Sequence, residues 1–521
     1  MATSIRWHVP GPLSAEEVQI ARDLHRIGKF YVFLRETRHE LFDDAFQAEL
    51  AAVYQPRGTA PVPPALLAMV LLLQAYDQVG DADAVVTARM DLRWQLVLGC
   101  LGATKAPFSQ GVLVAFRERL ITHDLDKRLI DRTIALAQQR GGFGWQRLRA
   151  ALDSSPLLGA GRVEDTWNLI GRAMGTVVTC AARTLGVPRA QVLEAANLTL
   201  LGASSLKAAL DIDWQDPTAQ ADALARVLAE VDRLEAWVGR HVPVTEAPAV
   251  QAALATLRQV LEQDLEPDPA SGQRRIRRGV AADRVPSVGD PAMRHGRKTK
   301  TRPFTGFKRH VMKLVDADLI VDAVVRPANE PEHATLARLT PAVAALGIMG
   351  ELLIDRGYLG SPVIGRLHAA GVTIRAKAWT STNRGRFPKQ VFTLNLQEGQ
   401  ATCPAGQRTA IPAGAVTIHF PATACVPCAL RAQCTTAARG GRSIALHPQE
   451  ALLQQLRQAQ QHPDGRVHLR ARTTVEHSLA RVQQIQGPKA RYKGLRKNTL
   501  DARRVAAVIN LQRVARLPVA A

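Results

Sequence analysis

Two short apolar runs, far apart in the chain, each lead directly into an aspartate. Leu148 to Leu152 is followed by Asp153, and Glu351 to Ile354 is followed by Asp355. Apolar runs of this length are typical of buried strands. If the two strands are neighbours in one sheet, both carboxylates lie where ligands gather in open α/β sheets. The pair predicts a sheet assembled from distant segments, although a lone Asp after a strand is more often a turn or helix cap.

A third acidic residue, Glu476, lies inside a helical pattern that runs from Arg470 to Gln484. Arg472 precedes it by one helical turn, on the same face. An i,i+4 ion pair on a solvated face is common and weak, so this pair alone indicates little. Three converging carboxylates, however, suit two Mg²⁺ ions, because hard cations take oxygen ligands and a metal pair clamps an in-line phosphoryl displacement.

Positive charge is concentrated in the second half of the chain. The 521 residues carry a formal net charge of +21. Residues 286–521 hold 35 Lys and Arg against 13 Asp and Glu, whereas residues 1–285 hold 32 against 33. Many of these cations flank Glu476, namely Arg466, Arg470, Arg481, Lys489, Arg491, Lys493, Arg496 and Lys497. A basic half in a folded protein suggests a nucleic-acid partner before a membrane.

Composition favours a folded protein of the cytoplasm. A hydrophobic content of 46% supports real cores. Met1 to Leu13 has no apolar signal region, and the apolar run Leu66 to Ala75 is too short to span a bilayer. We therefore expect a soluble cytoplasmic protein with no membrane partner.

Helical patterns occupy two long parts of the chain. Residues 14–140 read as helices, among them an apolar helix Ala65–Tyr76 that starts after Pro64, and Gly141, Gly142 and Gly144 form a linker. Residues 160–285 are helical again, with apolar residues at i, i+3 and i+4 spacing that indicate a helical core. Residues 265–303 are polar, basic and Pro-containing, and we expect a loop there.

Strand patterns resume after this loop. Phe307–Val315 and Leu319–Val325 read as a hairpin joined by Asp316, Ala317 and Asp318. Helices are expected at 331–346 and 362–370, and the strands 351–354 and 372–376 alternate with them. The order predicts an α/β mixed sheet with the helical block 160–285 inserted after its first strand, an insertion tolerated where chain ends lie close together at the surface.

Four cysteines cluster between residues 395 and 450, at Cys403, Cys425, Cys428 and Cys434. Four thiolates with one C-x-x-C pair suit a tetrahedral structural Zn²⁺, and nearby Pro and Gly provide tight turns. Buried small side chains or a redox pair are the alternatives, and we favour the metal. Cys100 and Cys180 lie in apolar helical surroundings and are expected to be simply buried.

The order of several short motifs resembles the RNase H-like DDE transposases of bacterial insertion sequences. The resemblance covers most of the chain, including its helical N-terminal region. In that family the third acid lies in a Tyr-x-x-Arg-x-x-x-Glu-x-x-x-x-x-x-Lys pattern. This chain keeps the Arg and the Glu as Arg472 and Glu476, while Leu469 and Gln483 replace the Tyr and the Lys. The other matching stretches are Ala151–Ser155, Gly296–Lys298, Gly306–Lys308, Arg326–Glu330, Ile354–Tyr358 and Arg491–Lys497 with the segment through Asn510 and Leu511.

The resemblance implies a domain plan: a helical DNA-end-binding domain at 1–140 and an RNase H-like catalytic domain at 141–521, interrupted by the helical insertion 160–285 and the cysteine insertion 395–450. It implies that Asp153, Asp355 and Glu476 are catalytic and hold two Mg²⁺ or Mn²⁺ ions. It also implies a DNA-binding set comprising Arg472, Arg297, Lys298, Lys308, Arg356, Lys489, Arg491, Tyr492, Lys493, Arg496 and Lys497.

The implied function is transposition: binding of terminal inverted repeats, pairing of two ends by a homodimer, metal-dependent strand cleavage and attack of the freed 3′-hydroxyl on target DNA, acting on the nucleoid. Two alternatives stay open, a structure-selective nuclease without strand transfer and a non-catalytic DNA-binding repressor. For Tyr492, stacking on an unpaired base and packing within the protein are both open, with packing favoured.

Overall fold

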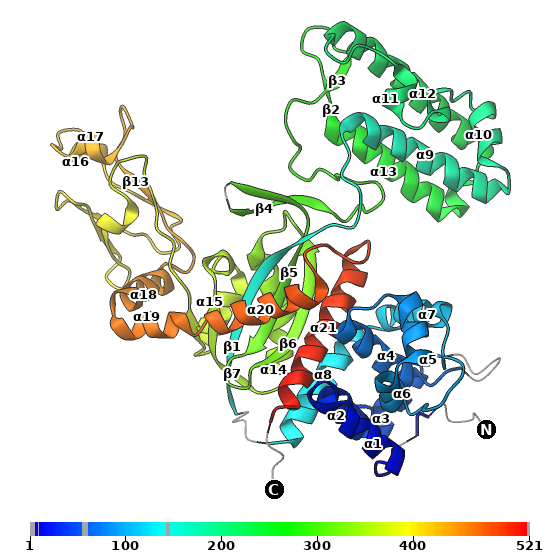
Figure 1. Cartoon of the computed structure of the whole chain (residues 1–521). Coiled ribbons are helices and arrows are strands. Elements are labelled where there is room, and N and C mark those ends of the chain that lie inside the picture. The colour runs from blue at the N-terminus through cyan, green and yellow to red at the C-terminus, as the bar shows by residue number, and fades with distance from the viewer. Residues whose placement is uncertain (1–5, 9, 55–60, 142–145, 300, 518–521) are drawn as a thin grey trace.

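The computed structural model describes residues 6–8, 10–54, 61–141, 146–299 and 301–517. A central sheet adjoins a bundle of N-terminal helices, and two further parts of the chain project from it, one helical and one with short strands (Figure 1). Most of the predicted glycine linker lies outside the described residues. None of the described helices is long and apolar enough to cross a membrane.

The N-terminal region is entirely helical, as predicted. Its centre is α4 (Pro64–Asp77), whose first twelve residues are all buried. A helix that is apolar on all sides must be surrounded by other helices. Pro64 suits the first position of α4, because the N–H of a residue there would have no acceptor within the helix and proline has no N–H. The surrounding helices are α1 (Ala15–Asp23), α2 (His25–Leu41), α3 (Asp44–Ala51), α5 (Asp81–Met90), α6 (Leu92–Leu98), α7 (Gln110–Thr122) and α8 (Asp126–Gln139).

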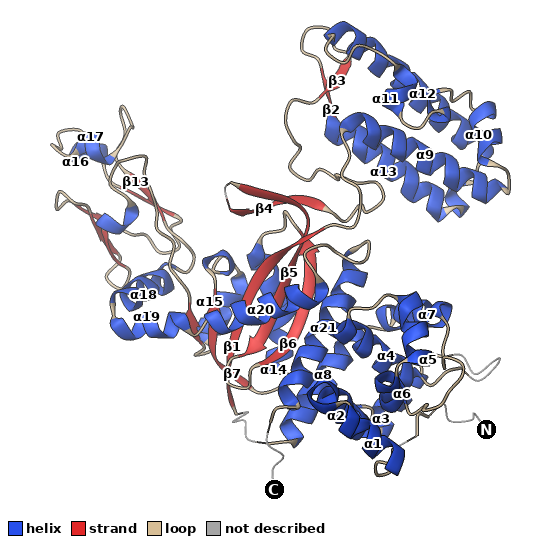
Figure 2. Cartoon of the chain, in the orientation of Figure 1, coloured by secondary structure: helices blue, strands red, loops and turns tan. Residues whose placement is uncertain are grey.

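The central sheet mixes parallel and antiparallel strands (Figure 2). Its order is β4-β5-β1-β7-β8, with β6 also paired to β5. β1 runs parallel to β7, which runs parallel to β8, whereas β5 is antiparallel to β1, β4 and β6. The strands are β1 (Arg147–Leu158), β4 (Arg294–Thr299), β5 (Arg302–Leu314), β6 (Leu319–Pro327), β7 (Ile348–Ile354) and β8 (Thr373–Arg375).

The two aspartate-bearing runs are indeed adjacent parallel strands, but Asp153 does not end its strand. β1 continues to Leu158, and Asp153 to Leu158 pair with β5 in register Asp153↔Val311 to Leu158↔Gly306. Only the pairing with β7 stops, at Leu152↔Ile354. The expected strand end is therefore wrong for Asp153, because the antiparallel partner extends beyond the parallel one.

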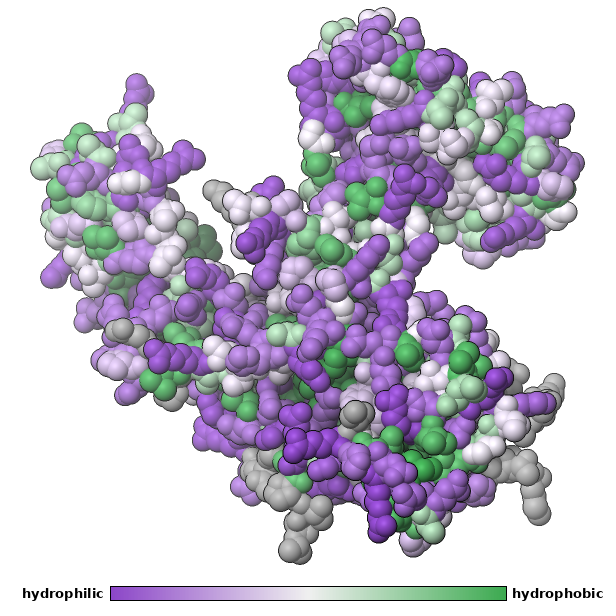
Figure 3. Space-filling view, in the orientation of Figure 1, coloured by the Kyte–Doolittle hydropathy of each residue, from purple (hydrophilic) through white to green (hydrophobic). Residues whose placement is uncertain are grey.

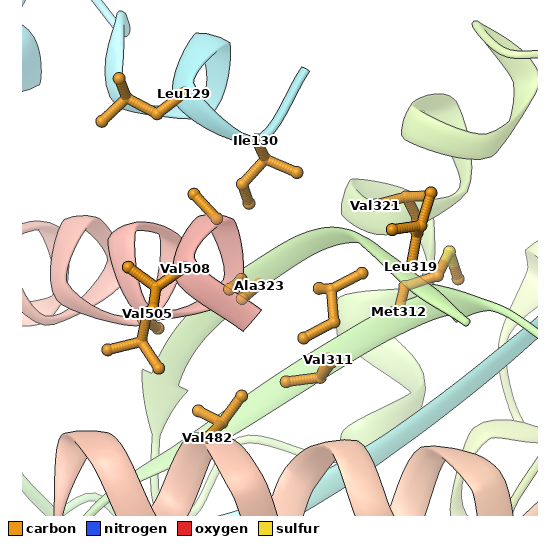
Figure 4. Packing of buried hydrophobic residues seen from close by; sticks show 14 of the residues in the cluster. Leu129, Ile130, Val311, Met312, Leu319, Val321, Ala323, Val482, Val505 and Val508 are labelled. Carbon is orange, nitrogen blue, oxygen red and sulfur yellow. The ribbon is translucent and has the colours of Figure 1, made fainter. Parts of the chain in front are cut away.

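Helices cover the sheet and join it to the N-terminal bundle. α20 (Thr473–Gln486) packs on β1, and α21 (Leu495–Val514) packs on β6, α8 and α4. Figure 4 shows Leu129 and Ile130 of α8 beside Val505 and Val508 of α21 and Ala323 of β6. One continuous hydrophobic core thus extends from the N-terminal helices into the sheet. The remaining helical elements beside the sheet are η3 (Glu332–Thr335), α14 (Leu336–Ala344), η4 (Arg356–Tyr358) and α15 (Pro362–Ala369).

The helical insertion lies between β1 and β4 and has a hydrophobic core of its own. The part expected to be a loop, 265–303, instead contains the hairpin β2 (Leu265–Pro267) and β3 (Arg274–Ile276) and the strand β4. β4 is polar on both faces, so its sequence carries no alternating pattern. The helices are α9 (Thr166–Leu185), α10 (Arg189–Ala195), η1 (Leu200–Gly202), α11 (Leu206–Leu210), α12 (Pro217–His241), η2 (Val244–Glu246) and α13 (Pro248–Asp264).

The cysteine-containing segment forms the second projecting part, around a small core that includes Phe392 and Phe420. Two helices, α18 (Glu450–Gln461) and α19 (Pro463–Arg470), lead from it back to α20. Its elements are η5 (Lys389–Val391), β9 (Thr393–Asn395), β10 (Gln400–Thr402), β11 (Arg408–Ala410), β12 (Thr417–His419), α16 (Ala422–Cys425), α17 (Arg431–Cys434) and β13 (Ser443–Ala445).

Candidate active site

Asp153 and Asp355 follow the same ladder pair on neighbouring strands. Leu152↔Ile354 is the last pair of the β1–β7 ladder, and each aspartate is the next residue along the chain. Both carboxylates are held by local backbone groups, since Ser154 N donates to Asp153 Oδ1 and Arg356 N donates to Asp355 Oδ1, each at 2.8 Å. The sheet therefore brings these two predicted residues together.

Arg472 connects the first of these acids to the third. Its Nη1 donates to Asp153 Oδ2 at 2.9 Å, and its Nη2 donates to Glu476 Oε1 at 2.6 Å. The i,i+4 pair on α20 is thus more than a surface ion pair, because the same guanidinium also binds a residue of β1. Asp153 is largely buried, with 16% of its side chain exposed, whereas Glu476 is 48% exposed.

The environment of Asp153 disfavours its negative charge. Burial, together with the smaller effect of the Asp355 and Glu332 carboxylates, raises the pKa of Asp153 to about 6. The Ser154 N–H and the Arg472 guanidinium act in the opposite direction. Two neighbouring acids disfavour the charged form of a carboxyl group, whereas a nearby cation favours it. These surroundings are the electrostatic setting of a cation site.

Glu332 is a fourth acidic residue at this position, and the sequence did not single it out. Ser154 Oγ donates to Glu332 Oε1 at 2.5 Å. Gly357 lies against the same carboxylate, because a Cβ there would stand 2.1 Å from Glu332 Oε2. The available signal was its position two residues after the Arg326–Glu330 motif.

Two fully buried side chains lie behind these acids. His310 Nδ1 and the Tyr358 hydroxyl share a hydrogen bond of 2.8 Å. Burial lowers the pKa of His310 to about 3, so its imidazole is neutral. Burial also holds the pKa of Tyr358 well above its usual value, with the neighbouring Glu332 and Asp153 adding to the effect. Both groups therefore stay uncharged beside the carboxylates.

The predicted DNA-binding residues before Glu476 are spread along the sheet. Arg297 and Lys298 are exposed on β4, and Arg356 is exposed beside Asp355. Lys308 on β5 donates to the carbonyl of Glu330 at 3.1 Å. Arg356 is the nearest of the four to the acids in sequence and in space.

The basic tail after Glu476 packs on the N-terminal helices. Arg496 Nη2 binds Asp126 Oδ1 at 2.5 Å and Asp124 Oδ1 at 2.8 Å, and Lys497 binds Glu118 at 2.5 Å. The Tyr492 ring lies between Arg117 and Arg504, with guanidinium carbons 5.6 and 5.8 Å from its centroid.

Three other cations of the tail remain at the surface. Arg491 donates to the carbonyl of Val79 at 3.2 Å and is exposed, as are Lys489 and Lys493. The tail thus divides into residues that join parts of the protein and residues that face solvent.

The four predicted zinc ligands line one small cavity in the projecting segment. Burial raises the pKa of the Cys434 thiol, and the other three thiols raise it further against the Arg442 charge. The donor set fits a soft tetrahedral metal. Within the described residues, however, no three His, Cys, Asp or Glu side chains are arranged to hold a metal ion, neither here nor at the acidic site.

Comparison with known families gives two matches. Residues 402–515 match the family described as Transposase DDE domain, and residues 25–119 match the Transposase domain (DUF772). No curated protein and no solved structure matches. The first match contains Arg472, Glu476 and the four cysteines, while Asp153 and Asp355 lie between the two matched segments. Both matched families are transposase domains, one of them of the DDE type, and together they support the assignment of the chain to the DDE transposases of insertion sequences.

Proposed function

We propose that this transposase binds the terminal inverted repeats of its element, cuts the DNA strands and joins the freed 3′-hydroxyl to target DNA, with Asp153, Asp355 and Glu476 as metal ligands. One observation carries the proposal. Arg472 binds Asp153 and Glu476 at once, so carboxylates 323 positions apart lie within reach of one guanidinium, beside Asp355.

The acidic residues fit a hard divalent cation such as Mg²⁺ or Mn²⁺, since all their donors are oxygen. When bound, a metal pair supplies an activated water or hydroxyl and neutralises charge that develops on the phosphate. Arg472 pairs with both Asp153 and Glu476. Its guanidinium would also be able to bind a phosphate of the DNA strand beside these acids.

The order of the strands supports an RNase H-like catalytic core. β6, β5 and β1 are successive antiparallel neighbours, and β7 and β8 continue the sheet in parallel with β1. On this assignment residues 141–521 form the catalytic domain, with insertions at 160–285 and 395–450, and residues 1–140 bind the DNA end. The four cysteines of the second insertion would hold a structural Zn²⁺.

DNA contacts in this scheme come from exposed cations and from the half-buried Lys308. Arg297, Lys298, Lys308 and Arg356 would follow one strand along the sheet, and Lys489, Arg491 and Lys493 would meet it beyond Glu476. Such contacts fix register and affinity but read no sequence. Two copies of the chain would pair the two ends of the element on the nucleoid.

The test is a cleavage and joining assay with a labelled inverted-repeat duplex and Mg²⁺. Asp153→Asn, Asp355→Asn and Glu476→Gln should each abolish cleavage while DNA binding is kept. Asp316→Asn is the matched control, because Asp316 is an acid at the other end of the sheet that binds Arg149. Cleavage without joined products would indicate a nuclease, and binding without metal-dependent cleavage would indicate a repressor.

A further inference from the structure

The helical insertion has a groove on its surface, lined by polar and charged side chains beside a few residues of its hydrophobic core. The groove has a volume of about 700 Å³ and runs along α9, with the segment Leu200–Leu206 as its opposite wall. Four arginines line it, namely Arg162, Arg172, Arg183 and Arg189. All four are exposed, and none of them belongs to the acidic site or to the basic tail.

Helical geometry places two of the arginines on one face of α9. Arg172 and Arg183 are eleven residues apart on α9, which is close to three full turns, so both side chains emerge on the same face about 16 Å apart. Arg162 precedes the helix by four residues. Arg189 begins α10 after Gly186, which ends α9 in the left-handed conformation with φ of 69° and turns the chain back.

These cations have little internal compensation. Arg172 binds the buried Glu164 at 2.5 Å, which is the one carboxylate lining the groove. Among the described residues, no carboxylate lies within ion-pair distance of Arg162, Arg183 or Arg189, and Arg189 makes only a long bond of 3.4 Å to the Leu201 carbonyl. Three guanidinium groups therefore remain available to a ligand.

The groove gathers four arginines although the insertion as a whole carries no net positive charge. Residues 160–285 contain 14 Lys and Arg but 16 Asp and Glu, so the insertion as a whole is slightly acidic. In Figure 3 hydrophilic side chains dominate the visible face of the insertion. Within this slightly acidic insertion, the groove combines three arginines that have no carboxylate partner among the described residues with Arg172, which gives it a local positive charge suited to an anion.

We propose that this groove binds the phosphodiester backbone of the element's DNA, at a site separate from the catalytic acids. The inference rests on the proposed function, in which the substrate is duplex DNA. Guanidinium groups pair with phosphate through two parallel N–H···O bonds. Spacing of about 16 Å along a helix of about 30 Å matches several successive phosphates of one strand, which follow at about 3.4 Å of duplex axis. The groove then holds DNA that flanks the cleavage position and adds affinity without reading sequence.

The experiment measures binding of the full chain to an inverted-repeat duplex across a salt series. The test variant is Arg162→Ala/Arg183→Ala/Arg189→Ala. The control variant is Arg226→Ala/Arg240→Ala/Arg274→Ala, which removes the same charge from exposed residues of the insertion outside the groove. Three lost phosphate contacts should reduce the slope of log K against log[salt] by about 2.7 and weaken binding about a hundredfold near 0.15 M salt.

A second measurement locates the DNA. A photoreactive amino acid at Thr176, inside the groove, should cross-link the duplex, whereas the same group at Arg226 should not. The triple Arg→Lys variant should restore most of the salt slope, because it keeps the charge. Thermal unfolding of every variant shows that a loss of binding is not a loss of folding.

The outcomes separate this inference from the proposed function. If the groove variant and the control bind equally and Thr176 gives no cross-link, the groove inference is overturned while transposition stands. If the wild-type chain neither binds nor cuts end DNA, the proposed function fails first. If the groove variant changes only the oligomeric state without DNA, the groove binds an acidic surface of another copy, and the assignment to DNA is wrong.

Discussion

Arg472 Nη1 lies 2.9 Å from Asp153 Oδ2, joining the start of α20 to the middle of the central sheet. Its other terminal nitrogen binds Glu476, so the distance between the two acids depends on this one side chain. Without it, two carboxylates would face each other uncompensated. Arg472 is therefore a positioning residue for the two acids, and in the proposed reaction it also binds a phosphate.

Replacing Arg472 by Ala should reduce single-turnover cleavage about 10²- to 10³-fold, the usual loss when one preorganised donor to a reacting group is removed. Arg472→Lys should recover part of the rate, since one charge remains without the fork geometry. The control is Arg481→Ala on the same helix, where Arg481 binds only Gln484 and Gln512. Equal rates for Arg472→Ala and Arg481→Ala would remove Arg472 from the site.

Asp153→Asn should stabilise the metal-free protein at neutral and higher pH. The folded pKa of Asp153 is raised to about 6, above its unfolded value, so the protonated form is the one that favours folding. That contribution is full below the unfolded pKa and is lost as pH rises through 6. The substitution should then raise the free energy of unfolding by up to about 2–3 kcal/mol at pH 8. Loss of the ion pair between Asp153 and Arg472 would reduce this gain.

The measurement is urea unfolding of wild type and Asp153→Asn at pH 8 and pH 5 without divalent cations. The difference in free energy of unfolding should shrink as pH falls toward 5. If the difference in free energy of unfolding stayed constant with pH, folding would not raise the pKa of the Asp153 carboxyl.

Glu332→Gln should weaken binding of Mn²⁺ to the metal-free protein by about 10- to 100-fold, the usual effect of removing a partner that supports a ligand from behind. Glu332 acts through Ser154, the residue after Asp153, because its carboxylate accepts a hydrogen bond from the Ser154 hydroxyl. Glu330→Gln is the control, because Glu330 lies two residues before Glu332 but pairs with Arg326, four residues earlier in the sequence. The free Mn²⁺ signal in electron paramagnetic resonance gives the affinity directly, and unchanged affinity in Glu332→Gln would make Glu332 merely structural.

Local patterns predicted the elements that carry the acids. Apolar runs predicted the adjacent strands β1 and β7, and helical spacing predicted α20 with Arg472 and Glu476 on one face. The turn at Asp316 to Asp318 was also predicted, and Asp318 has a φ of 57°, which Asp tolerates better than most residues. These features depend on residues close together in sequence, which is why pattern reasoning finds them.

The features that the sequence did not reveal depend on distant partners. β4 is a polar strand that exists because β5 extends far enough to pair with it. Glu332 matters because Ser154 of β1 reaches it, and no pattern around residue 332 contains that contact. The basic tail looked uniform, but Asp124 and Asp126 of the N-terminal region bind Arg496 and leave Lys493 exposed.

Zinc content should separate the two groups of cysteines. Cys425→Ser/Cys428→Ser should remove most of the zinc bound per chain and lower the thermal stability of the segment around Phe392 and Phe420, because four thiolates are needed for a closed tetrahedral site. Cys100→Ser/Cys180→Ser is the control with the same number of thiols removed. Wild-type protein purified without chelator that contains less than about half an equivalent of zinc would contradict the site.

Mutation should affect stability at the tail residues that bind the N-terminal helices, and DNA binding at those that face solvent. Arg496→Ala should lower stability by about 1–3 kcal/mol, because Asp126 is almost fully buried and would keep only Arg503 as its partner. Lys493→Ala should leave stability unchanged, since Lys493 is exposed, and should lower the salt slope of DNA binding by about 0.9 if it binds a phosphate. Urea unfolding and a salt series on specific and random duplexes measure both quantities for each variant. A normal salt slope in Lys493→Ala/Arg491→Ala would place the DNA away from this end of α20, and the path along β4 and β5 would then have to carry the phosphate contacts alone.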